Sequence, residues 1–107
     1  MTRPQALIVD DEPDIRELVT ITLGRMGIDC VSAATLGEAR EALDLTHFDL
    51  CLTDMRLPDG NGLELVNFIQ QRHPSLPIAV ITAHGSMEAA IQALKSGAFD
   101  FVNKPVD

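Results

Sequence analysis

The sequence predicts an α/β domain, built as a doubly wound, five-stranded parallel sheet with helices on both of its faces. Two observations lead to this fold class. Short apolar runs alternate with helix-like patterns five times along the 107 residues. The runs at 6–9, 50–52 and 78–81 are also uniformly apolar, whereas a strand with one solvent face alternates apolar and polar residues. These strands are therefore expected to be buried on both faces.

Cap and turn residues divide the first half of the chain into elements. The strands of the whole sheet are expected at 6–9, 29–32, 48–53, 77–82 and 100–103. Pro13 suits the first turn of a helix that Gly27 ends. Thr35, followed three residues later by Glu38, forms the pattern of a capping box, which predicts that a second helix begins there.

A turn-rich segment with prolines and glycines separates the third strand from the third helix, which Pro74 ends. A fourth helix is expected from Ser86 to Gly97. A fifth helix should follow the last strand, but the chain stops at Asp107, so we expect that helix to have been truncated. The apolar sheet face left uncovered should destabilise the monomer or drive self-association.

The helix after Pro13 is expected to bury one apolar face against the sheet. Helical periodicity places the following residues on that face: Ile15, Leu18, Val19, Thr22 and Met26. In the second helix the same reasoning buries Leu36, Ala39 and Leu43. Both helices are therefore predicted to be amphipathic, with one side on the sheet and one side in solvent.

Composition and charge exclude several classes of protein. The chain is 46% hydrophobic and 22% charged, which is ordinary for a soluble domain. Its net charge is −8 and its eight basic residues form no run, so we expect no direct contact with nucleic acid. No apolar run is long enough for a membrane span, and no secretory signal is expected at the N-terminus. These features favour a cytoplasmic domain.

The two cysteines, Cys30 and Cys51, both lie in apolar, strand-like runs. Buried free cysteines are typical of such positions, and they fit a reducing cytoplasm. We expect both thiols to lie in the core. A disulfide between them is not expected, because the first strand of the sheet should separate the strands that carry them.

Charged and hydroxyl side chains terminate the apolar strands. Asp10 and Asp11 follow the first strand, Asp54 the third, Thr82 the fourth and Lys104 the fifth. Because parallel strands end on one rim of the sheet, these groups should share a pocket. Clustered carboxylates repel each other unless a cation compensates them, and Mg²⁺ suits a few carboxylates, water and a phosphoryl oxygen. The set predicts phosphoryl transfer, with Asp54 as the nucleophile that forms an acyl phosphate.

Several of these residues also have a simpler interpretation. Asp10, Asp11 and Glu12 would suit the N-terminus of a helix, where the macrodipole favours acids. Asp54 alone would suit the cap of a turn, and Asp59 is expected to make the turn rather than to bind metal. The histidines have no metal-ligand spacing and are expected to face solvent: His47, His73 and His84. Only the combination of these residues at several strand ends favours a catalytic site.

Four separated motifs occur in order along the chain: Val9–Glu12, Thr53–Pro58 with Gly60 and Gly62, Ile81–Ala83, and Asn103–Pro105. Together they resemble the receiver domain of a bacterial two-component response regulator. The segments 82–86 and 93–101 further resemble the nitrogen-regulator (NtrC) class and, within it, regulators of type IV pilus transcription. The resemblance implies a flavodoxin-like receiver fold with strand order 2-1-3-4-5, and one receiver domain over residues 1–107.

The resemblance assigns roles at the phosphorylation site. Asp54 would accept a phosphoryl group from the phosphohistidine of a sensor histidine kinase. Mg²⁺ would be held by three carboxylates and one backbone carbonyl, from Asp10, Asp11, Asp54 and Arg56. Arg56 and His84 lie two residues beyond Asp54 and Thr82, so both are candidates for tuning the lifetime of the acyl phosphate.

Further roles carried over from the family concern the switch that reads the phosphoryl group. Thr82 and Lys104 would bind phosphoryl oxygens, and the bond before Pro105 would be cis. Phe101 matches an aromatic position that rotates when the hydroxyl of Thr82 is drawn inward. The fourth helix and the fifth strand would then form the readout surface and the contact of a homodimer.

The implied function is a phosphorylation-dependent signalling switch. The domain would carry out its own phosphotransfer and autodephosphorylation, and it would not be an enzyme with an external substrate. It would regulate an attached output, namely an ATPase that activates the sigma-N form of RNA polymerase together with a DNA-binding domain. The pilus resemblance implies type IV pilus genes as the target.

Three other functions share parts of this pattern. A Mg²⁺-dependent phosphohydrolase generally carries a second acid two residues after its nucleophile, where this chain has Arg56. A flavin- or nucleotide-binding module would have a loop rich in glycine or hydroxyl groups after the first strand, where this chain has Asp10–Pro13. A degenerate receiver that only mediates contacts would lack site residues, and all five expected ones are present. The switch is therefore favoured.

Overall fold

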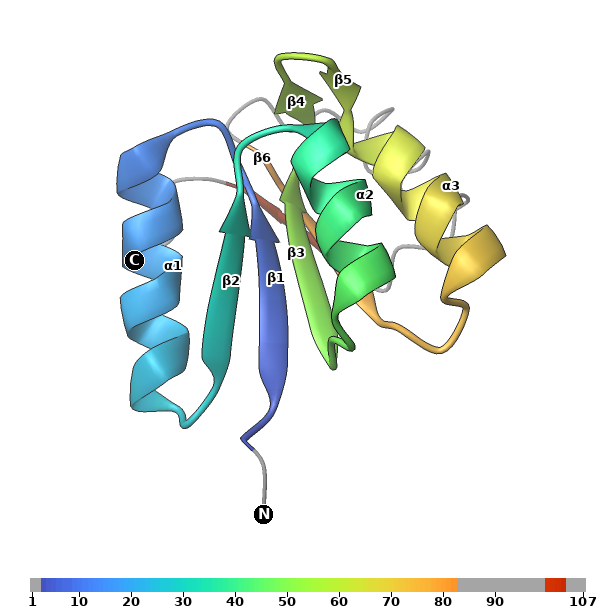
Figure 1. The fold of residues 1–107 in the computed structure, drawn as a ribbon. Helices are drawn as coiled ribbons and strands as arrows, with labels where there is room; N and C mark the ends of the chain where they lie inside the picture. The colour runs from blue at the N-terminus through green and yellow to red at the C-terminus, as the bar shows by residue number, and fades with distance from the viewer. Residues whose placement is uncertain (1–2, 83–99, 104–107) are drawn as a thin grey trace.

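A five-stranded parallel sheet forms the centre of the computed structural model, which describes residues 3–82 and 100–103 (Figure 1). Its strands are β1 (Gln5–Val9), β2 (Asp29–Ala33), β3 (Leu50–Asp54), β6 (Ile78–Thr82) and β7 (Asp100–Asn103). They lie in the order β2-β1-β3-β6-β7, and every neighbouring pair is parallel. This is the predicted order 2-1-3-4-5, so the fold class is confirmed.

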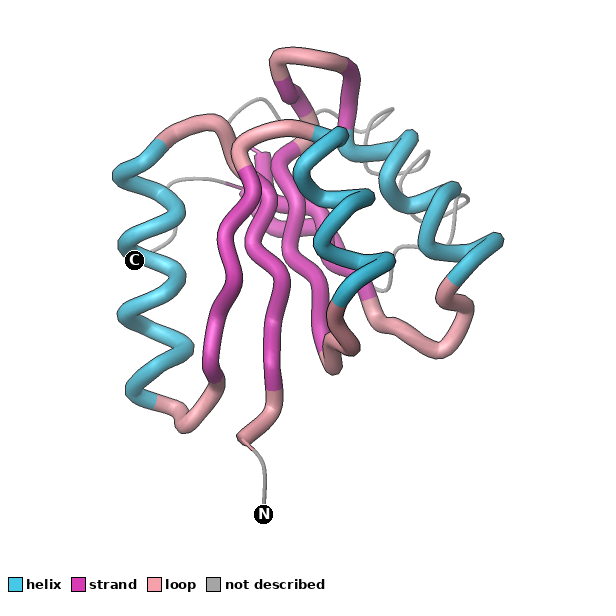
Figure 2. Tube along the Cα trace, in the orientation of Figure 1, coloured by secondary structure: helices cyan, strands magenta, loops and turns pink. Residues whose placement is uncertain are grey.

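Helices cover both faces of the sheet, as Figure 2 shows by colour. The helices of the described residues are α1 (Pro13–Arg25), α2 (Leu36–Leu45) and α3 (Gly62–Arg72). α1 packs on the face that carries Ala6 and Ile8, whereas α2 and α3 pack on the face that carries Leu7 and Val9. None of these helices is long and apolar enough to cross a lipid bilayer. The predicted fourth helix, 86–97, lies outside the described residues.

β1 shows why the strand sequences are uniformly apolar. Ala6 to Val9 are all at most 2% exposed, because successive side chains enter the cores on opposite faces of the sheet. The predicted face of α2 is confirmed, since Leu36, Ala39 and Leu43 are all buried. β1 is thereby covered on both sides, and the residue that follows it is held in a fixed place.

α1 buries only part of the face predicted for it, since Ile15 and Val19 pack on the sheet as expected but the other three predicted residues do not. Val19 is its buried residue, and Ile15 and Leu23 pack beside it, which forms one row of residues spaced four apart. Three residues predicted on the buried face are instead exposed: Leu18, Thr22 and Met26. The prediction was wrong for these three because apolar residues lie on two sides of this helix. Their spacing does not say which side meets the sheet.

A small antiparallel hairpin, which the sequence did not predict, follows β3. β4 (Arg56–Leu57) pairs with β5 (Gly60–Asn61). At its end the Asn61 side chain accepts a hydrogen bond from the Glu64 amide (3.1 Å), and the Glu64 carboxylate accepts one from the Asn61 amide (2.9 Å). This reciprocal capping box fixes the start of α3.

Gly62, the first residue of α3, lies against the end of β3. A Cβ atom at this position would overlap the backbone carbonyl of Asp54. The Gly62 amide also donates a hydrogen bond to the Met55 carbonyl at 2.7 Å. The close approach of Gly62 to the Asp54 carbonyl therefore requires glycine. This contact joins the hairpin and α3 directly to the end of β3.

Cys30 and Cys51 lie on opposite faces of the sheet, in strands that β1 separates. Both thiols are free, so the expectation that they form no disulfide is confirmed. Cys51 is fully buried beneath α2 and α3, as predicted. Cys30 is only half-buried, because it lies in the edge strand β2.

The two thiols should differ in reactivity. Burial raises the pKa of both, which keeps the thiolate fraction low in slightly alkaline buffer. An alkylating reagent should therefore modify Cys30 slowly and Cys51 only after unfolding in urea, as read by intact mass. The Cys30→Ser variant reports Cys51 alone. Alkylation of that variant in the folded state would contradict the packing of β3.

Thr35 caps α2 as predicted. Its hydroxyl accepts a hydrogen bond from the Glu38 amide at 3.1 Å. The return bond differs from the predicted box, because the Glu38 carboxylate accepts from the amide of Ala34 (3.4 Å) rather than from that of Thr35. The start of α2 is thus fixed by bonds on both sides of its cap.

Thr35→Ala should lower the free energy of unfolding by about 1 kcal/mol, because an amide at the helix start loses its acceptor. Urea unfolding followed by far-ultraviolet circular dichroism measures it, which suits a chain without Trp or Tyr. Thr22→Ala is the matched control, since the Thr22 hydroxyl only bonds the Leu18 carbonyl within α1 (2.8 Å) and its loss should matter little. Equal losses in the two variants would rule out the cap.

Candidate functional site

Four carboxylates gather at the edge of the sheet where β1 and β3 end. Asp10 directly follows β1, and Asp54 is the last residue of β3. These strands pair in parallel, with Val9 opposite Thr53, so the two carboxylates leave the sheet side by side. One oxygen of each member lies within 4.8 Å of the others in the acidic cluster, which consists of Asp10, Asp11, Glu12 and Asp54.

The backbone around Asp10 holds its carboxylate in place. The residue is 2% exposed, and Oδ1 accepts a hydrogen bond from the Glu12 amide at 2.9 Å. Its own amide donates to the Ala33 carbonyl at 3.0 Å, and its carbonyl accepts from Nη1 of Arg16 at 2.7 Å. Asp10 is therefore bonded to the end of β2 through Ala33, to the N-cap of α1 through Glu12, and to the first turn of α1 through Arg16.

Asp54 is held in the same way at the end of β3. It is 7% exposed, and Oδ1 accepts a hydrogen bond from the Met55 amide at 2.8 Å. The Thr53 hydroxyl donates to the Asp54 carbonyl at 3.0 Å, and Gly62 packs directly against that carbonyl. The position of this carboxylate is thus set by β3 behind it and by the hairpin and α3 in front of it.

The cluster combines buried and exposed charge. Asp10 and Asp54 are buried, whereas Asp11 and Glu12 are exposed, so the cluster opens to solvent on one side. Four carboxylates this close repel each other unless a cation or protons compensate them. A hard divalent cation prefers oxygen ligands, and Mg²⁺ in particular takes a few carboxylates and keeps several waters. The donor atoms and the open side both fit such an ion.

The structure brings together the three acidic residues that the sequence singled out: Asp10, Asp11 and Asp54. It adds Glu12, which the sequence indicates only as part of the motif Val9–Glu12 and of an acidic helix start. Glu12 is the N-cap residue of α1, yet its side chain makes no cap hydrogen bond there. Its position next to Asp11 was the signal available in the sequence. The side chain of Arg56 lies exposed on the hairpin.

The remaining predicted residues lie on or beyond β6 and β7. β6 pairs with β3 so that Ile81 lies opposite Asp54, which brings the backbone of Thr82 to the same edge of the sheet. In β7, Phe101 pairs with Val80. The side chains of Thr82 and Phe101 lie outside the described residues, as do three whole residues of the predicted site: His84, Lys104 and Pro105.

Asp59 does not join the acidic cluster, as expected. Both of its carboxylate oxygens accept hydrogen bonds from backbone amides of α2, namely those of Leu36 (2.8 Å) and Gly37 (3.0 Å). These two bonds hold the pKa of the Asp59 carboxyl below its ordinary value. The residue therefore makes the turn, as predicted, and also reaches across to a helix that is distant in sequence.

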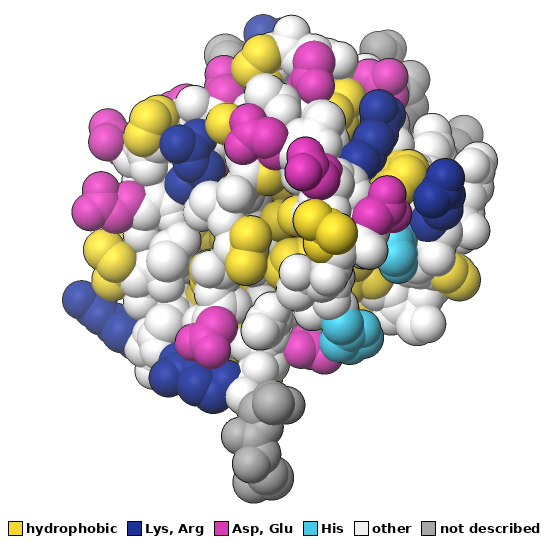
Figure 3. Space-filling view, in the orientation of Figure 1, with side chains coloured by type: hydrophobic (Ala, Val, Ile, Leu, Met, Phe, Trp, Pro, Cys, Tyr) yellow, Lys and Arg dark blue, Asp and Glu magenta, His cyan; other side chains and the backbone are white. Residues whose placement is uncertain are grey.

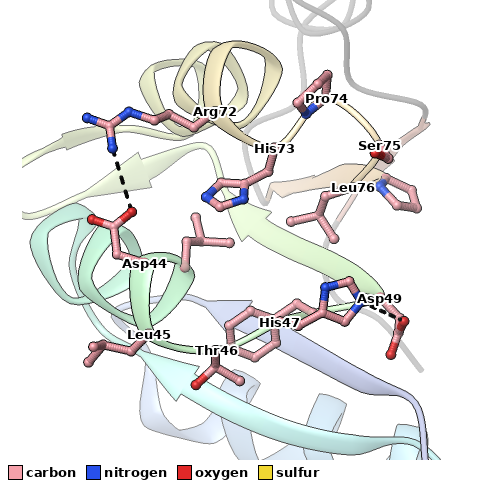
Figure 4. Close-up of a pocket in the computed structure, with 13 residues that line it drawn as sticks. Asp44, Leu45, Thr46, His47, Asp49, Arg72, His73, Pro74, Ser75 and Leu76 are labelled. Carbon is pink, nitrogen blue, oxygen red and sulfur yellow. Dashed lines mark ion pairs between the residues drawn. The ribbon is translucent and has the colours of Figure 1, made fainter.

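A pocket of about 550 Å³ lies at the opposite end of the sheet, before the first residues of β3 and β6 (Figure 4). Its buried apolar lining consists of Leu43, Phe48 and Leu76. On its rim, Arg72 pairs with Asp44 at 3.8 Å and His47 with Asp49 at 3.4 Å. The exposed charges of Arg72 and Asp44 compensate each other, so we place the candidate site at the acidic cluster.

The histidines around this pocket behave differently from each other. The side chain of His47 is 89% exposed, as predicted. His73 is half-buried, and among the described residues its Nε2 atom has no hydrogen-bond partner. The prediction of a solvent-facing side chain was wrong for His73, because its ring lies beside that of Phe68, with 6.1 Å between the two ring centroids.

The surface charge agrees with the composition. Figure 3 shows Lys and Arg side chains interspersed with Asp and Glu on the face it draws, rather than gathered in one patch. Two of the arginines, Arg40 and Arg72, lie over the ring of Phe68, with their guanidinium carbons 5.8 and 5.3 Å from its centroid. These cations contribute to contacts between α2 and α3 and form no basic stripe for a nucleic-acid backbone.

Comparisons with known proteins match nearly the whole chain to one family. A family model described as the response regulator receiver domain matches residues 6–107. The response regulator protein PilR of Pseudomonas aeruginosa is 69% identical over all 107 residues, which cover 24% of its length. The DNA-binding transcriptional regulator NtrC of Klebsiella pneumoniae is 40% identical over the same residues, 23% of its length. The chain thus spans about a quarter of these relatives.

Among solved structures, the chain is similar to the beryllofluoride-activated NtrC4 receiver domain dimer. The two share 35% identity and superpose with a TM-score of 0.91. The match covers 96% of this chain and 85% of the other. The likeness therefore extends over nearly the whole domain and includes both strands that carry the buried carboxylates.

Proposed function

The chain belongs to the response regulator receiver domain family, in its NtrC-type branch, and we propose that Asp54 is the residue on which it is phosphorylated. The observation that carries this proposal is the place of Asp54 in the acidic cluster. Its carboxylate ends a central strand, is nearly buried, and lies beside those of Asp10, Asp11 and Glu12. A phosphorylation-dependent switch needs one positioned nucleophile, and this site supplies one.

In the proposed reaction, a carboxylate oxygen of Asp54 attacks the phosphorus of a phosphohistidine on a sensor kinase. The new P–O bond forms as the P–N bond breaks, and the electron pair of the broken bond stays on the imidazole nitrogen. The product is an acyl phosphate on Asp54. Attack by water later releases inorganic phosphate and restores the carboxylate. The domain therefore switches its own state and does not turn over an external substrate.

We propose Mg²⁺ as the cation of the acidic cluster. Its ligands would be the carboxylates of Asp10, Asp11 and Asp54 with the backbone carbonyl of Arg56. The fit is supported by the oxygen donors within 4.8 Å of one another and by the exposed side of the cluster. When bound, Mg²⁺ neutralises carboxylates and phosphoryl oxygens. The hydrogen bonds of Asp10 and Asp54 to the neighbouring backbone orient their oxygens for this role.

The switch itself would involve residues of β6 and β7. We propose that Thr82 and Lys104 bind phosphoryl oxygens, and that Phe101 changes its rotamer in response. The pairing of Thr82 with Asn103, the residue before Lys104, supports this grouping. A cis bond before Pro105 remains a prediction from the family. Two residues are further proposed to tune the lifetime of the acyl phosphate: Arg56 and His84.

The function of the rest of the protein is proposed from its relatives. These relatives are a response regulator protein and a DNA-binding transcriptional regulator, and this chain matches about a quarter of each. We propose that the domain regulates an attached sigma-N-dependent ATPase with a DNA-binding domain, at type IV pilus genes. Its partner would be a sensor histidine kinase, its location the cytoplasm, and its own surface would touch neither nucleic acid nor membrane.

Incubation with Mg²⁺ and a small acyl-phosphate donor should add one phosphoryl group, as read by intact mass. The adduct should disappear in Asp54→Ala, which lacks the nucleophile, and when EDTA removes the metal. Absence of any adduct on the unsubstituted chain, or an adduct that persists in Asp54→Ala, would overturn the proposed function.

A matched pair of variants tests the metal site in the same experiment. Asp11→Asn removes a carboxylate of the acidic cluster, so it should need a higher Mg²⁺ concentration to reach the same adduct yield. Asp14→Asn makes the same change in the first turn of α1, outside the cluster, and should behave like the unsubstituted chain. Comparing the two variants therefore distinguishes the loss of a metal ligand from the loss of one negative charge near the start of the helix.

A homodimer is also proposed, through the fourth helix and β7. The similarity to a receiver domain described as a beryllofluoride-activated dimer supports it. Beryllofluoride occupies the place of a phosphoryl group on the aspartate, so its addition with Mg²⁺ should increase the sedimentation coefficient of the chain. The Asp54→Ala variant provides the control. Identical sedimentation with and without beryllofluoride would argue against phosphorylation-dependent dimerisation.

A further inference from the structure

The segment 33–37, which runs from the end of β2 into α2, is bonded to Asp10 of the acidic cluster and to Asp59 in the hairpin after β3. On one side, the Ala33 carbonyl accepts a hydrogen bond from the Asp10 amide at 3.0 Å. On the other side, the carboxylate of Asp59 accepts from the amides of Leu36 and Gly37 at 2.8 and 3.0 Å. The segment 33–37 therefore links the residue after β1 to the hairpin after β3.

The segment that makes these contacts is itself well fixed. Ala33 is 3% and Leu36 1% exposed, and both belong to the core beneath α2 and α3. Thr35 caps the helix between them through the Glu38 amide. Asp59, in contrast, lies exposed in the turn between β4 and β5, so we expect the two bonds to restrain that turn more than they restrain α2.

Besides these two bonds, the hairpin contacts the rest of the protein through Leu57, which is 8% exposed and belongs to the core beneath α2 and α3, and at its base and tip. At its base, the Gly62 amide bonds the Met55 carbonyl at 2.7 Å. At its tip, Gly60 lies so close to Leu36 that a Cβ atom would overlap its side chain. The two hydrogen bonds that the Asp59 carboxylate accepts connect the hairpin to a helix that is distant in the sequence.

We propose that Asp59 is a positioning residue for the metal site, which it orders by tying the hairpin after Asp54 to the N-terminus of α2. The inference rests on the proposed function, in which the Arg56 carbonyl on this hairpin is a ligand of Mg²⁺. Without these two hydrogen bonds, the hairpin is more mobile, and the Arg56 carbonyl lies away from the metal site for part of the time. Mg²⁺ affinity then falls although every ligand is still present.

The chemistry of these two hydrogen bonds explains why a carboxylate, that of Asp59, occupies this position. The first amides of a helix have no partner within it and carry partial positive charge, so a carboxylate with two acceptor oxygens satisfies two of them at once. An amide side chain has one acceptor oxygen and no charge. The lowered pKa of Asp59 means that the tie persists at neutral pH and is lost only as the pH falls through that value.

Calorimetric titration with Mg²⁺ tests the inference without any phosphorylation step. Loss of a supporting contact typically weakens metal binding by about 10- to 100-fold. We expect the loss of Mg²⁺ affinity in Asp59→Ala to lie near the lower end of this range, because the Asp59 carboxylate is exposed. Asp59→Asn should fall between Asp59→Ala and the unsubstituted chain, since its amide oxygen can still accept one bond. Saturating Mg²⁺ should restore the yield of phosphoryl adduct in both variants.

Thr35→Ala is the matched control, because it weakens the same helix start but leaves Asp59 and its two acceptor oxygens in place. It should lower the stability of the protein to urea without moving the Mg²⁺ affinity. Unchanged Mg²⁺ binding in Asp59→Ala, or an equal loss in Thr35→Ala, would overturn the role of Asp59. If the unsubstituted chain itself neither bound Mg²⁺ nor gained an adduct, the proposed function would fail instead.

Discussion

The parallel pairing of β1 with β3 is the constraint on which the rest of the structure depends. It brings Asp10 and Asp54 out of the sheet side by side, although their charges repel each other. Residues 6–9 of β1 are buried on both faces of the sheet, and this burial keeps the two strands together. The energy that the apolar core supplies is thus what permits a strained arrangement of charge at one edge.

The fold class and three members of the acidic cluster were predictable because they follow from simple regularities. Uniformly apolar strands imply a sheet covered on both faces, and strand ends in such a sheet converge. The resemblance to a known family then supplied the order 2-1-3-4-5. Asp10, Asp11 and Asp54 needed no knowledge of loops, since each lies at or directly after a strand.

What the sequence did not indicate depends on contacts between distant segments. The buried side of α1 is chosen by the shape of the sheet, which periodicity alone does not contain, so Leu18 was misplaced. The hairpin β4–β5 has only two residues in each strand, too few for any alternation. The bonds of Asp59 to α2 join positions 22 and 23 residues apart, and no local pattern marks them.

Gly62 has a consequence for how the gene can vary. Every missense change at its codon adds a side chain, and any side chain there meets the carbonyl of the phosphoacceptor candidate Asp54. Variation at this codon therefore disturbs the backbone of the proposed nucleophile without changing any carboxylate. A residue with no chemistry of its own thus becomes one of the least replaceable in the domain.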